Sequence, residues 1–481
     1  MQYTEKDTKR FYELGQDDNI HEEPYRSEWS RDLARLIHCR AFRQLQGKTQ
    51  LLPGLQKEFS RNRVTHSLEV SQVAKSIAEK LNFELKKQNL DYEISEKICE
   101  FAALAHDIGR PPFGKFGEMA LNLKMKDCGG FEGNAQTFRI LTKVAKKHYI
   151  SGTVLDTGLT KEGEDLRVGL NLSFRSLASI LKYDNIIPEK LDFDYEENVQ
   201  LIKGHYESED NLVREIKKAF TGNETFKNFK TIESQIVDLA NDISLATYDI
   251  DDAFRTGFVT PLDVISMNDV VLANITKKIN SNLNTQYKES EIYDVFLNIF
   301  DGILGKPINS SEVDLTEKEE DTLYATSVAL TYRASEKLAL NGYYRVNFIS
   351  KLIGRFIRSI HIQKIDKTIP ALSKISIDPQ IQLEIEALKN FMYHSQIMHP
   401  NVQIIKHRGK EILCAIFDAL SEKTYGADLL PTEVQVIYNH SKDEMSRKRT
   451  ICDYISGMTD NQALELYNRL QSGNPQFVFK Q

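Results

Sequence analysis

The stretch Phe101-Ala-Ala-Leu-Ala-His106-Asp107-Ile-Gly-Arg-Pro-Pro-Phe113 decides how the rest of the chain is interpreted. An apolar helical run closes on an adjacent His–Asp pair, and the following glycine and Pro111-Pro112 end the helix. Neighbours on a helix point about 100° apart, so His106 and Asp107 can face one ion only near a helix end or from a central position. The pair therefore marks a candidate metal site at the end of this helix.

A second histidine, His66, stands in the segment RNRVTHSLEV, residues 61–70. It lies at the head of an expected helix whose apolar residues Leu68, Val70 and Val73 follow helical spacing. Two imidazoles and a carboxylate suit a divalent transition metal with open positions for water or a phosphate oxygen. A histidine that follows an apolar run is also a common core or cap residue, so spacing alone leaves both interpretations open.

The composition favours a protein with a large core that lies in the cytoplasm. The 481 residues suffice for one large domain or two, and a net charge of −7 with interspersed signs gives no indication of nucleic-acid binding. The cysteines form no CxxC pair, which points to a reducing compartment. The polar start Met1-Gln-Tyr-Thr-Glu-Lys-Asp is unlike a signal peptide, and no apolar run approaches the roughly 20 residues of a membrane span. The five cysteines are Cys39, Cys99, Cys128, Cys414 and Cys452.

Helical periodicity dominates the chain, so the expected fold class is mainly α. Glycine and threonine gather in residues 149–172, which predicts a small β-like insertion or a loop. The helix expected over 232–254 places residues 241, 245, 249 and 252 on one face, and buried acidic groups there would call for a cation or basic ligand opposite. Other expected helices cover 30–38, two patterns between 66 and 107 separated by a turn at 90–95, a segment ending near 147, 174–182 and 452–460.

Three segments together resemble the HD-domain superfamily, and specifically its deoxyguanosinetriphosphate triphosphohydrolase (dGTPase) branch. They are RNRVTHSLEV at 61–70, LAHDIGRPPFGKFGE at 104–118 and GGFEGNAQTFRILT at 129–142. The likeness continues through 169–174, 181–183, 238–243 and 452–460, and so covers nearly the whole chain. It implies a mainly α HD-domain helical core with extra helices. The implied parts are an N-terminal arm over 1–30, the HD domain with the metal and nucleotide site over 31–260, and a helical C-terminal region over 261–481 that completes the pocket and the oligomer contacts.

The resemblance also implies a chemistry. In this family a metal held by His, His-Asp and a distant Asp grips the α-phosphate of a dNTP, and water releases the nucleoside and intact tripolyphosphate. By position, His66, His106 and Asp107 match metal ligands, and Arg63 matches an arginine that binds substrate phosphate. Glu118 matches the acidic partner of the catalytic histidine. The metal is a divalent ion, with Mn, Mg, Fe, Zn and Co all left open.

Further substrate contacts are implied less directly. Gln44 is expected to contact the base or sugar, although an exposed helix glutamine is an equal alternative. Lys203 and Tyr206 match a basic and aromatic segment near the triphosphate, and Asp249 is assigned to the substrate pocket. The family also implies homo-oligomers, and some members respond to an allosteric nucleotide or single-stranded DNA.

This chain departs from the family pattern at positions that carry chemistry. Lys115 stands where the family has its catalytic histidine, and Asn241 stands where it has its fourth metal ligand, an aspartate. Leu245 replaces a tyrosine, and the variable position after the HDIG motif is Arg110. Asparagine is a weaker ligand than a carboxylate, and a lysine that carries its proton is a poor base, although it can act as an acid or phosphate clamp. Asp242 could supply the carboxylate if the helix shifted by one residue.

Three functions follow from these observations. The first is a metal-dependent dNTP triphosphohydrolase, with dGTP as the expected substrate and Lys115, Asn241 and Leu245 as altered active-site residues. The second is a catalytically impaired nucleotide sensor or regulatory subunit. The third is an HD phosphohydrolase with another phosphoester substrate, against which the dGTPase-like segments outside the metal site argue.

Overall fold

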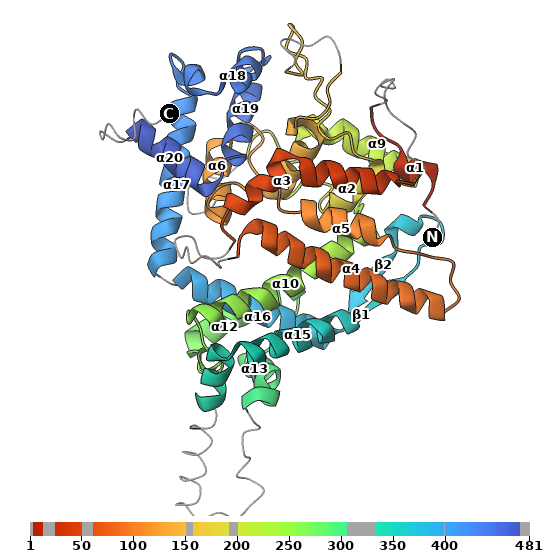
Figure 1. The fold of residues 1–481 in the computed structure, drawn as a ribbon, viewed down its shortest axis with the longest axis vertical. Coiled ribbons are helices and arrows are strands. Elements are labelled where there is room, and N and C mark those ends of the chain that lie inside the picture. Colours follow the sequence, from red (N-terminus) through yellow and green to blue (C-terminus); the bar gives the residue numbers. More distant parts are fainter. Residues whose placement is uncertain are drawn as a thin grey trace, which may run out of the picture. The chain divides into compact units, whose positions relative to one another are not determined.

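The computed structural model describes residues 3–12, 25–50, 61–150, 157–191, 201–304, 329, 332–398 and 400–471. Within these residues, helices predominate (Figure 1). The strands β1 (Ile360–Lys364) and β2 (Lys374–Ile377) pair in a two-stranded sheet. The mainly α class expected from the sequence is confirmed.

The chain forms two compact units, and each is discontinuous in sequence. The first unit comprises residues 1–238, 362–375 and 403–481, and the second comprises 239–361 and 376–402. Helix α10 (Ile232–Thr256) contributes residues to both.

The first unit holds the segments that carry the His and His-Asp motifs. Its α-helices are α1 (Glu5–Thr8), α2 (Glu28–His38), α3 (Arg40–Gln44), α4 (Arg63–Lys87), α5 (Glu96–Ala105), α6 (Gly114–Lys124), α7 (Gly133–Arg139), α8 (Phe174–Ile180), α9 (Asp210–Thr221), most of α17 (Pro400–Leu420), α18 (Thr432–Asn439), α19 (Glu444–Ser456) and α20 (Asp460–Gln471). A π-helical turn covers Ile140–Val144, and 3₁₀ turns cover Leu45–Gly47, Glu207–Glu209, Pro370–Leu372 and Gly426–Leu429.

Helix α5 lies at the centre of the first unit because it is apolar on nearly every side. Its residues from Phe101 to Ala105 are all buried, as expected for a helix with neighbours on several faces. Helices α2, α4 and α8 pack against it, and α2, α5 and α4 lie side by side in Figure 1. Both α4 and α5 begin at side-chain caps, where Asn62 accepts from the amide of Thr65 and Ser95 from that of Ile98.

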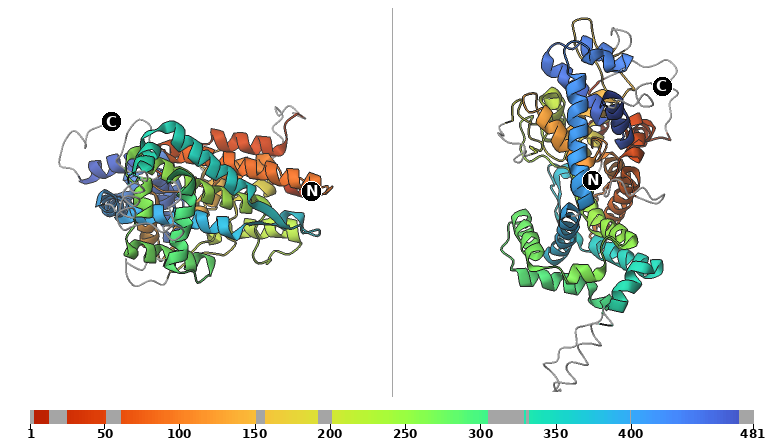
Figure 2. Two further views of the ribbon diagram at one scale, coloured as in Figure 1. Left: turned by 90° about the horizontal axis from the view of Figure 1, so that it is seen from below. Right: turned by 90° about the vertical axis from the view of Figure 1, so that its left-hand side faces the viewer.

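A second core joins the segment after the HD motif to the C-terminal helices. Leu121 of α6, Leu413 and Ile416 of α17, and Cys452 and Ile455 of α19 are buried in one cluster. Helix α17 is seen lengthwise in the right-hand view of Figure 2. Burial of these apolar side chains holds the 452–460 segment close to residues 110–118.

Besides most of α10, the described part of the second unit contains the five helices α11, α12, α13, α15 and α16. Helix α12 packs against α13 and α16, and α13 also contacts α11 and α16. The bounds of these helices are α11 (Pro261–Ile265), α12 (Asp269–Leu283), α13 (Glu289–Leu304), α15 (Gly342–Arg358) and α16 (Pro379–Met398).

The structure corrects two local expectations, and a third, the β-like insertion or loop over 149–172, agrees with the described residues. The closing helix expected over 452–460 ends at Ser456, and a turn at Gly457 leads to Thr459, whose hydroxyl caps α20. Helix α2 begins earlier than expected, because Ser27 rather than Ser30 is its cap. The described part of 149–172 holds two isolated antiparallel bridges, Tyr149 with Arg167 and Leu159 with Asp165, and no named strand. Residues 151–156 of that expected insertion lie outside the described residues.

No helix among the described residues combines the length and apolar character needed to cross a membrane.

Candidate metal centre

The His and His-Asp motifs meet where α4 begins and α5 ends. Arg63 and His66 stand in the first turn of α4, and His106 follows the last residue of α5, with Asp107 in the turn after it. Because α4 packs against α5, one ligand atom each from His66, His106 and Asp107 lies within 4.8 Å of the others. The predicted triad is therefore brought together, and the helix end resolves the angular problem posed by adjacent ligands.

The hydrogen bond of His106 selects the ring nitrogen that faces the cluster. Its Nδ1 lies 2.7 Å from the carbonyl oxygen of Ala103, which can only accept, so Nδ1 carries the proton. The neutral Nε2 is left as a potential ligand, and it lies 3.9 Å from Oδ1 of Asp107. This arrangement, in which a ligating histidine donates its other N–H to a carbonyl, is the usual way to fix the tautomer at a metal site.

Both imidazoles are held neutral, which is the form that binds a metal. Burial, followed by the neighbouring His106 imidazole, lowers the pKa of His66 to about 3. Burial also lowers the pKa of His106, against the opposing effect of Asp107. Two neutral imidazoles and a carboxylate form a donor set that suits a divalent transition ion. The residues present therefore fit the metal that the sequence predicts.

Asp107 is held between two arginines. Nη1 of Arg63 lies 2.5 Å from Oδ2, and Nε of Arg110 lies 3.1 Å from Oδ1. Burial alone would raise the pKa of Asp107, but the Arg63 guanidinium, with a further contribution from Arg110, holds it well below its usual range. The carboxylate is thus ionised and ready to act as a ligand.

Arg110 connects the triad to Glu118. Nη1 of Arg110 lies 2.5 Å from Oε2 of Glu118, and Oε1 of Glu118 accepts from the amide of Gly133 at 2.7 Å. Glu118 is only 1% exposed, and a buried carboxylate without such partners would be unfavourable. The charge of Glu118, despite the opposing effect of burial, raises the pKa of Arg110 further above its usual range.

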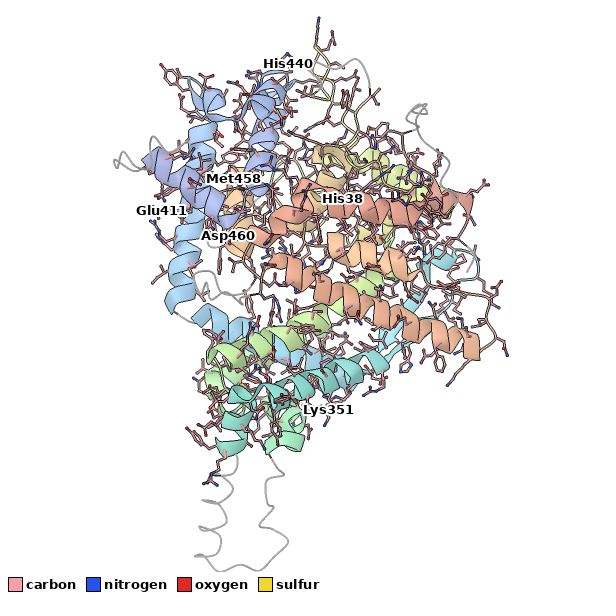
Figure 3. The ribbon with its side chains drawn as sticks, viewed as in Figure 1. His38, Lys351, Glu411, His440, Met458 and Asp460 are labelled. Carbon is pink, nitrogen blue, oxygen red and sulfur yellow. The ribbon has the colours of Figure 1, made fainter. Side chains whose placement is uncertain are left out.

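Two residues beyond the motif hold its backbone in place. Nζ of Lys48 donates to the carbonyl of Arg110 at 2.6 Å, from a fully buried side chain. Asp460, labelled in Figure 3, accepts from the amide of Phe113 at 3.0 Å and from the amide and hydroxyl of Thr49. Phe113 has a φ of +60°, a conformation that few non-glycine residues adopt. The Asp460 contact stabilises that bend directly before α6.

The remaining predicted residues of the first unit lie at different places. Lys115 is exposed in the first turn of α6, three residues before Glu118. Gln44 lines a separate cavity of about 1150 Å³ between α2, α3 and the C-terminal helices. Lys203 is exposed and donates to the hydroxyl of Tyr183 at 3.1 Å.

Tyr206 is only 3% exposed, and its hydroxyl contacts the amide of Glu132 and the side chain of Gln136. The guanidinium of Arg449 stacks over its ring, 3.9 Å from the centroid. Tyr206 therefore supports the loop before α7. The first residue of α7, Gly133, donates its amide hydrogen bond to Glu118.

Asn241, Asp242 and Asp249 belong to the part of α10 in the second unit. Asp249 is buried, whereas Asn241 and Asp242 are partly exposed. Asp242 pairs with Nζ of Lys389 at 3.0 Å, so its carboxylate already has a cationic partner within its own unit. The assignments of Asn241 to the metal and Asp249 to the substrate stay predictions.

Local sequence patterns do not indicate that Arg110, Lys48 or Asp460 belong to the centre. Arg110 occupies the variable position after the HDIG motif, although its place three residues after Asp107 is compatible with contact in a turn. Lys48 and Asp460 could not be identified from local patterns, because their partners lie 62 and 347 residues away in the chain.

Helices that converge on a buried His, His-Asp cluster define an HD-domain protein. The HD domain profile matches residues 63–245, and the profile of the phosphohydrolase-associated domain matches residues 375–469. These two matches include the metal cluster and the C-terminal helices that support its loop.

The full chain is similar to curated proteins with one shared name. It is 36% identical to a deoxyguanosinetriphosphate triphosphohydrolase-like protein 2 of Mesorhizobium japonicum, over 99% of both chains. It is 30% identical to a deoxyguanosinetriphosphate triphosphohydrolase-like protein of Shewanella woodyi, over 93% of both chains. It is 29% identical to a deoxyguanosinetriphosphate triphosphohydrolase-like protein 2 of Vibrio cholerae, over 92% of this chain and 88% of the relative. The chain belongs to this dGTP triphosphohydrolase-like family of HD-domain phosphohydrolases, and the family assignment made from the sequence is confirmed.

Proposed function

We propose that this protein hydrolyses deoxynucleoside triphosphates to the deoxynucleoside and tripolyphosphate, with dGTP as the first substrate to test. The observation that carries this proposal is the His66, His106 and Asp107 cluster, whose ligand atoms lie within 4.8 Å of one another beside the guanidinium of Arg63. The names of the full-length relatives support the substrate class.

In the proposed reaction, a water oxygen attacks the α-phosphorus and the bond to the sugar oxygen O5′ breaks. The water proton is lost, and O5′ gains a proton as the nucleoside leaves. When bound by His66, His106 and Asp107, a divalent ion would polarise a phosphoryl oxygen and offset the charge that develops there. The tripolyphosphate leaves intact because no bond beyond the α-phosphorus is broken.

The residues of this chain supply the remaining functions. Arg63 is suited to bind a phosphate oxygen, because its guanidinium already borders the cluster and offers paired N–H donors. Lys115 is exposed beside the buried Glu118 on α6, and we assign it the role of proton donor or phosphate clamp. Glu118 acts through Arg110, with which it pairs, rather than through a histidine.

Other parts of the proposal follow the resemblance. Asn241 is assigned as a fourth, neutral ligand, and Gln44, Lys203, Tyr206 and Asp249 as substrate contacts. A homo-oligomer and an allosteric nucleotide or single-stranded DNA effector are proposed on the same ground.

The test is a hydrolysis assay of the purified full chain with each of the four dNTPs, with Mn²⁺ and with EDTA. Tripolyphosphate and nucleoside should appear in equal amounts, with Mn²⁺ only, and their separation by ion-exchange chromatography distinguishes them from phosphate and diphosphate. Absence of turnover with all four dNTPs and with Mn²⁺, Mg²⁺, Fe²⁺, Zn²⁺ and Co²⁺ would refute the catalytic proposal.

A second candidate function is a nucleotide sensor or regulatory subunit. It is favoured by Lys115 in place of the expected histidine, together with the engagement of Glu118 by Arg110. Binding of a dNTP without turnover would support it. Turnover that disappears in His106→Ala would reject it.

A further inference from the structure

The charged groups at the metal centre form one connected chain. Arg63 contacts Asp107, Asp107 contacts Arg110, and Arg110 contacts Glu118. The two guanidinium groups and two carboxylates in this series of ion pairs have a summed formal charge of zero. A buried donor set usually attracts a dication through its net negative charge, and this chain of contacts provides none.

The position of Arg110 matters more than its charge alone. Its Nε contacts Oδ1 of Asp107, which is also the oxygen 3.9 Å from Nε2 of His106. Arg63 contacts the other oxygen, Oδ2. Both oxygens of the one carboxylate in the triad therefore already accept from a cation, and the oxygen that faces the histidine accepts from Arg110.

Arg110 is fixed where it stands. Its departure would leave Glu118, which is 1% exposed, without its cationic partner, and an uncompensated buried carboxylate is strongly unfavourable. Space is also limited, since a Cβ on Gly133 would lie 3.3 Å from Cδ and Nη1 of Arg110. Arg63 has Asp107 as its ion-pair partner among the described residues, and its Nε is buried with no hydrogen-bond partner there. Arg63 is therefore the arginine that can turn towards a phosphate.

We propose that this centre takes up its divalent ion together with a polyphosphate, as one metal–nucleotide complex, and binds the ion alone weakly. Arg110 repels a dication at Asp107, and the negative charges of a triphosphate offset that repulsion. Ion and nucleotide each raise the affinity of the other by the same factor, as linkage requires. This inference rests on the proposed function, because it takes the ligand to be a dNTP.

Binding measurements on the full chain test the inference without turnover. Calorimetry would be done with MnCl₂ alone, with α,β-imido-dGTP in EDTA, and with the preformed Mn²⁺ complex of this analogue. We expect the complex to bind at least about tenfold more tightly than the analogue in EDTA, a coupling in the ordinary range. The affinity difference between the complex and Mn²⁺ alone should be larger than the difference between the complex and the analogue in EDTA. Micromolar one-to-one binding of Mn²⁺ alone, or equal affinities for the analogue with and without metal, would overturn the inference.

Substitution of Arg110 tests whether this arginine causes the weak binding of Mn²⁺ alone. Arg110→Gln should raise the affinity for Mn²⁺ alone about tenfold, measured by electron paramagnetic resonance of free Mn²⁺. The control is Arg214→Gln, because the half-exposed Arg214 pairs with Asp210 outside the cluster, and the Mn²⁺ affinity of this variant should not change. If Arg110→Gln does not fold, Arg110→Gln/Glu118→Gln removes both charges of this ion pair and should change the affinity in the same direction. Unchanged or weaker Mn²⁺ binding in the folded variant contradicts the inference.

Different experimental results would refute the inference and the proposed function. Cooperative binding of Mn²⁺ and the analogue without hydrolysis of any dNTP would refute the catalytic proposal and leave the inference standing. Hydrolysis by a protein that binds Mn²⁺ tightly without nucleotide would do the reverse.

Discussion

Lys48 donates a hydrogen bond from Nζ to the backbone carbonyl of Ser456 at 2.7 Å, across 408 positions of the chain. The same nitrogen donates to the carbonyl of Arg110. One buried amino group thus joins the segment after α3, the end of α19 and the loop that carries the HD motif. The C-terminal region is in this way tied to the metal centre by a hydrogen-bond donor far away in the sequence.

Lys48→Met should destabilise the protein, because it removes the donor from the buried carbonyl of Ser456 and the partly buried carbonyl of Arg110. Each orphaned acceptor costs about 1–3 kcal/mol, so a loss of several kcal/mol in the free energy of unfolding is expected in urea. Lys147→Met is the matched control, since Lys147 is exposed, and its effect should stay within about 0.5 kcal/mol. Equal stabilities of the two variants would contradict the assigned role.

The cost of Lys48→Met should also grow with pH. Burial, followed by the charge of Arg63, lowers the pKa of Lys48 to about 7 in the folded protein, against about 10.4 in an unfolded chain. Between these values the unfolded state binds the extra proton, so the contribution of Lys48 to stability rises with pH by up to roughly 1.4 kcal/mol per unit. It is present in full above the unfolded pKa and lost as pH falls towards 7. Urea unfolding of both proteins at pH 7 and 9.5 measures the difference, and a constant gap would disprove it.

Arg139→Met should be among the most destabilising single changes in the first unit. Arg139 makes a paired contact with Asp453 and a further one with Glu209, and all three side chains are buried. Removing the cation leaves two buried carboxylates, at a cost of about 3–5 kcal/mol or more. Arg214→Met is the control, because the half-exposed pair of Arg214 with Asp210 should contribute less than about 1 kcal/mol. Thermal unfolding of the two variants should separate them clearly.

His106→Ala should abolish metal uptake while the fold persists. The variant loses one of three clustered ligands, and the affinity for Mn²⁺ in the presence of α,β-imido-dGTP should fall by more than about 100-fold, beyond what loss of a supporting hydrogen bond causes. Bound Mn²⁺ would be measured by elemental analysis after gel filtration. His361→Ala serves as the control, since His361 lies outside the cluster. Retained stoichiometric metal in His106→Ala would show that the ion binds elsewhere.

Lys115→Ala tests the proposed acid. If Lys115 delivers the proton to the leaving nucleoside, kcat should fall about 10²–10⁴-fold with little change in KM. If it only clamps phosphate, KM should rise instead. Lys124→Ala on the same helix is the control, because its partner is the exposed Asp418. Unchanged kcat and KM would remove Lys115 from both roles.

Lys115→His places a histidine where the family has its catalytic histidine. This change on its own should alter kcat little. Glu118 already has Arg110 and the amide of Gly133 as partners, so the new imidazole would find its expected acidic partner engaged. A rise in kcat of tenfold or more in this variant would show that Glu118 can exchange partners during turnover.

The sequence by itself determined the helices around the motif and the identity of the triad. Apolar periodicity and the break after Asp107 are local properties, and local properties suffice to place helix ends approximately. The motif spacing and the family resemblance then identified His66, His106 and Asp107 as a set. The turn within 452–460 is not predicted by local patterns, because the helical patterns on the two sides of Gly457 resemble one continuous helix.

Only the tertiary structure decided which partners these residues have. Glu118 pairs with Arg110, Lys48 holds the loop through two carbonyls, and Asp460 holds Phe113, in each case through contacts that sequence spacing does not encode. Such pairings depend on which buried charges and hydrogen-bond donors meet when the helices pack. The sequence therefore determined that the site can hold a metal, while tertiary packing decided that its carboxylate is shared between two arginines.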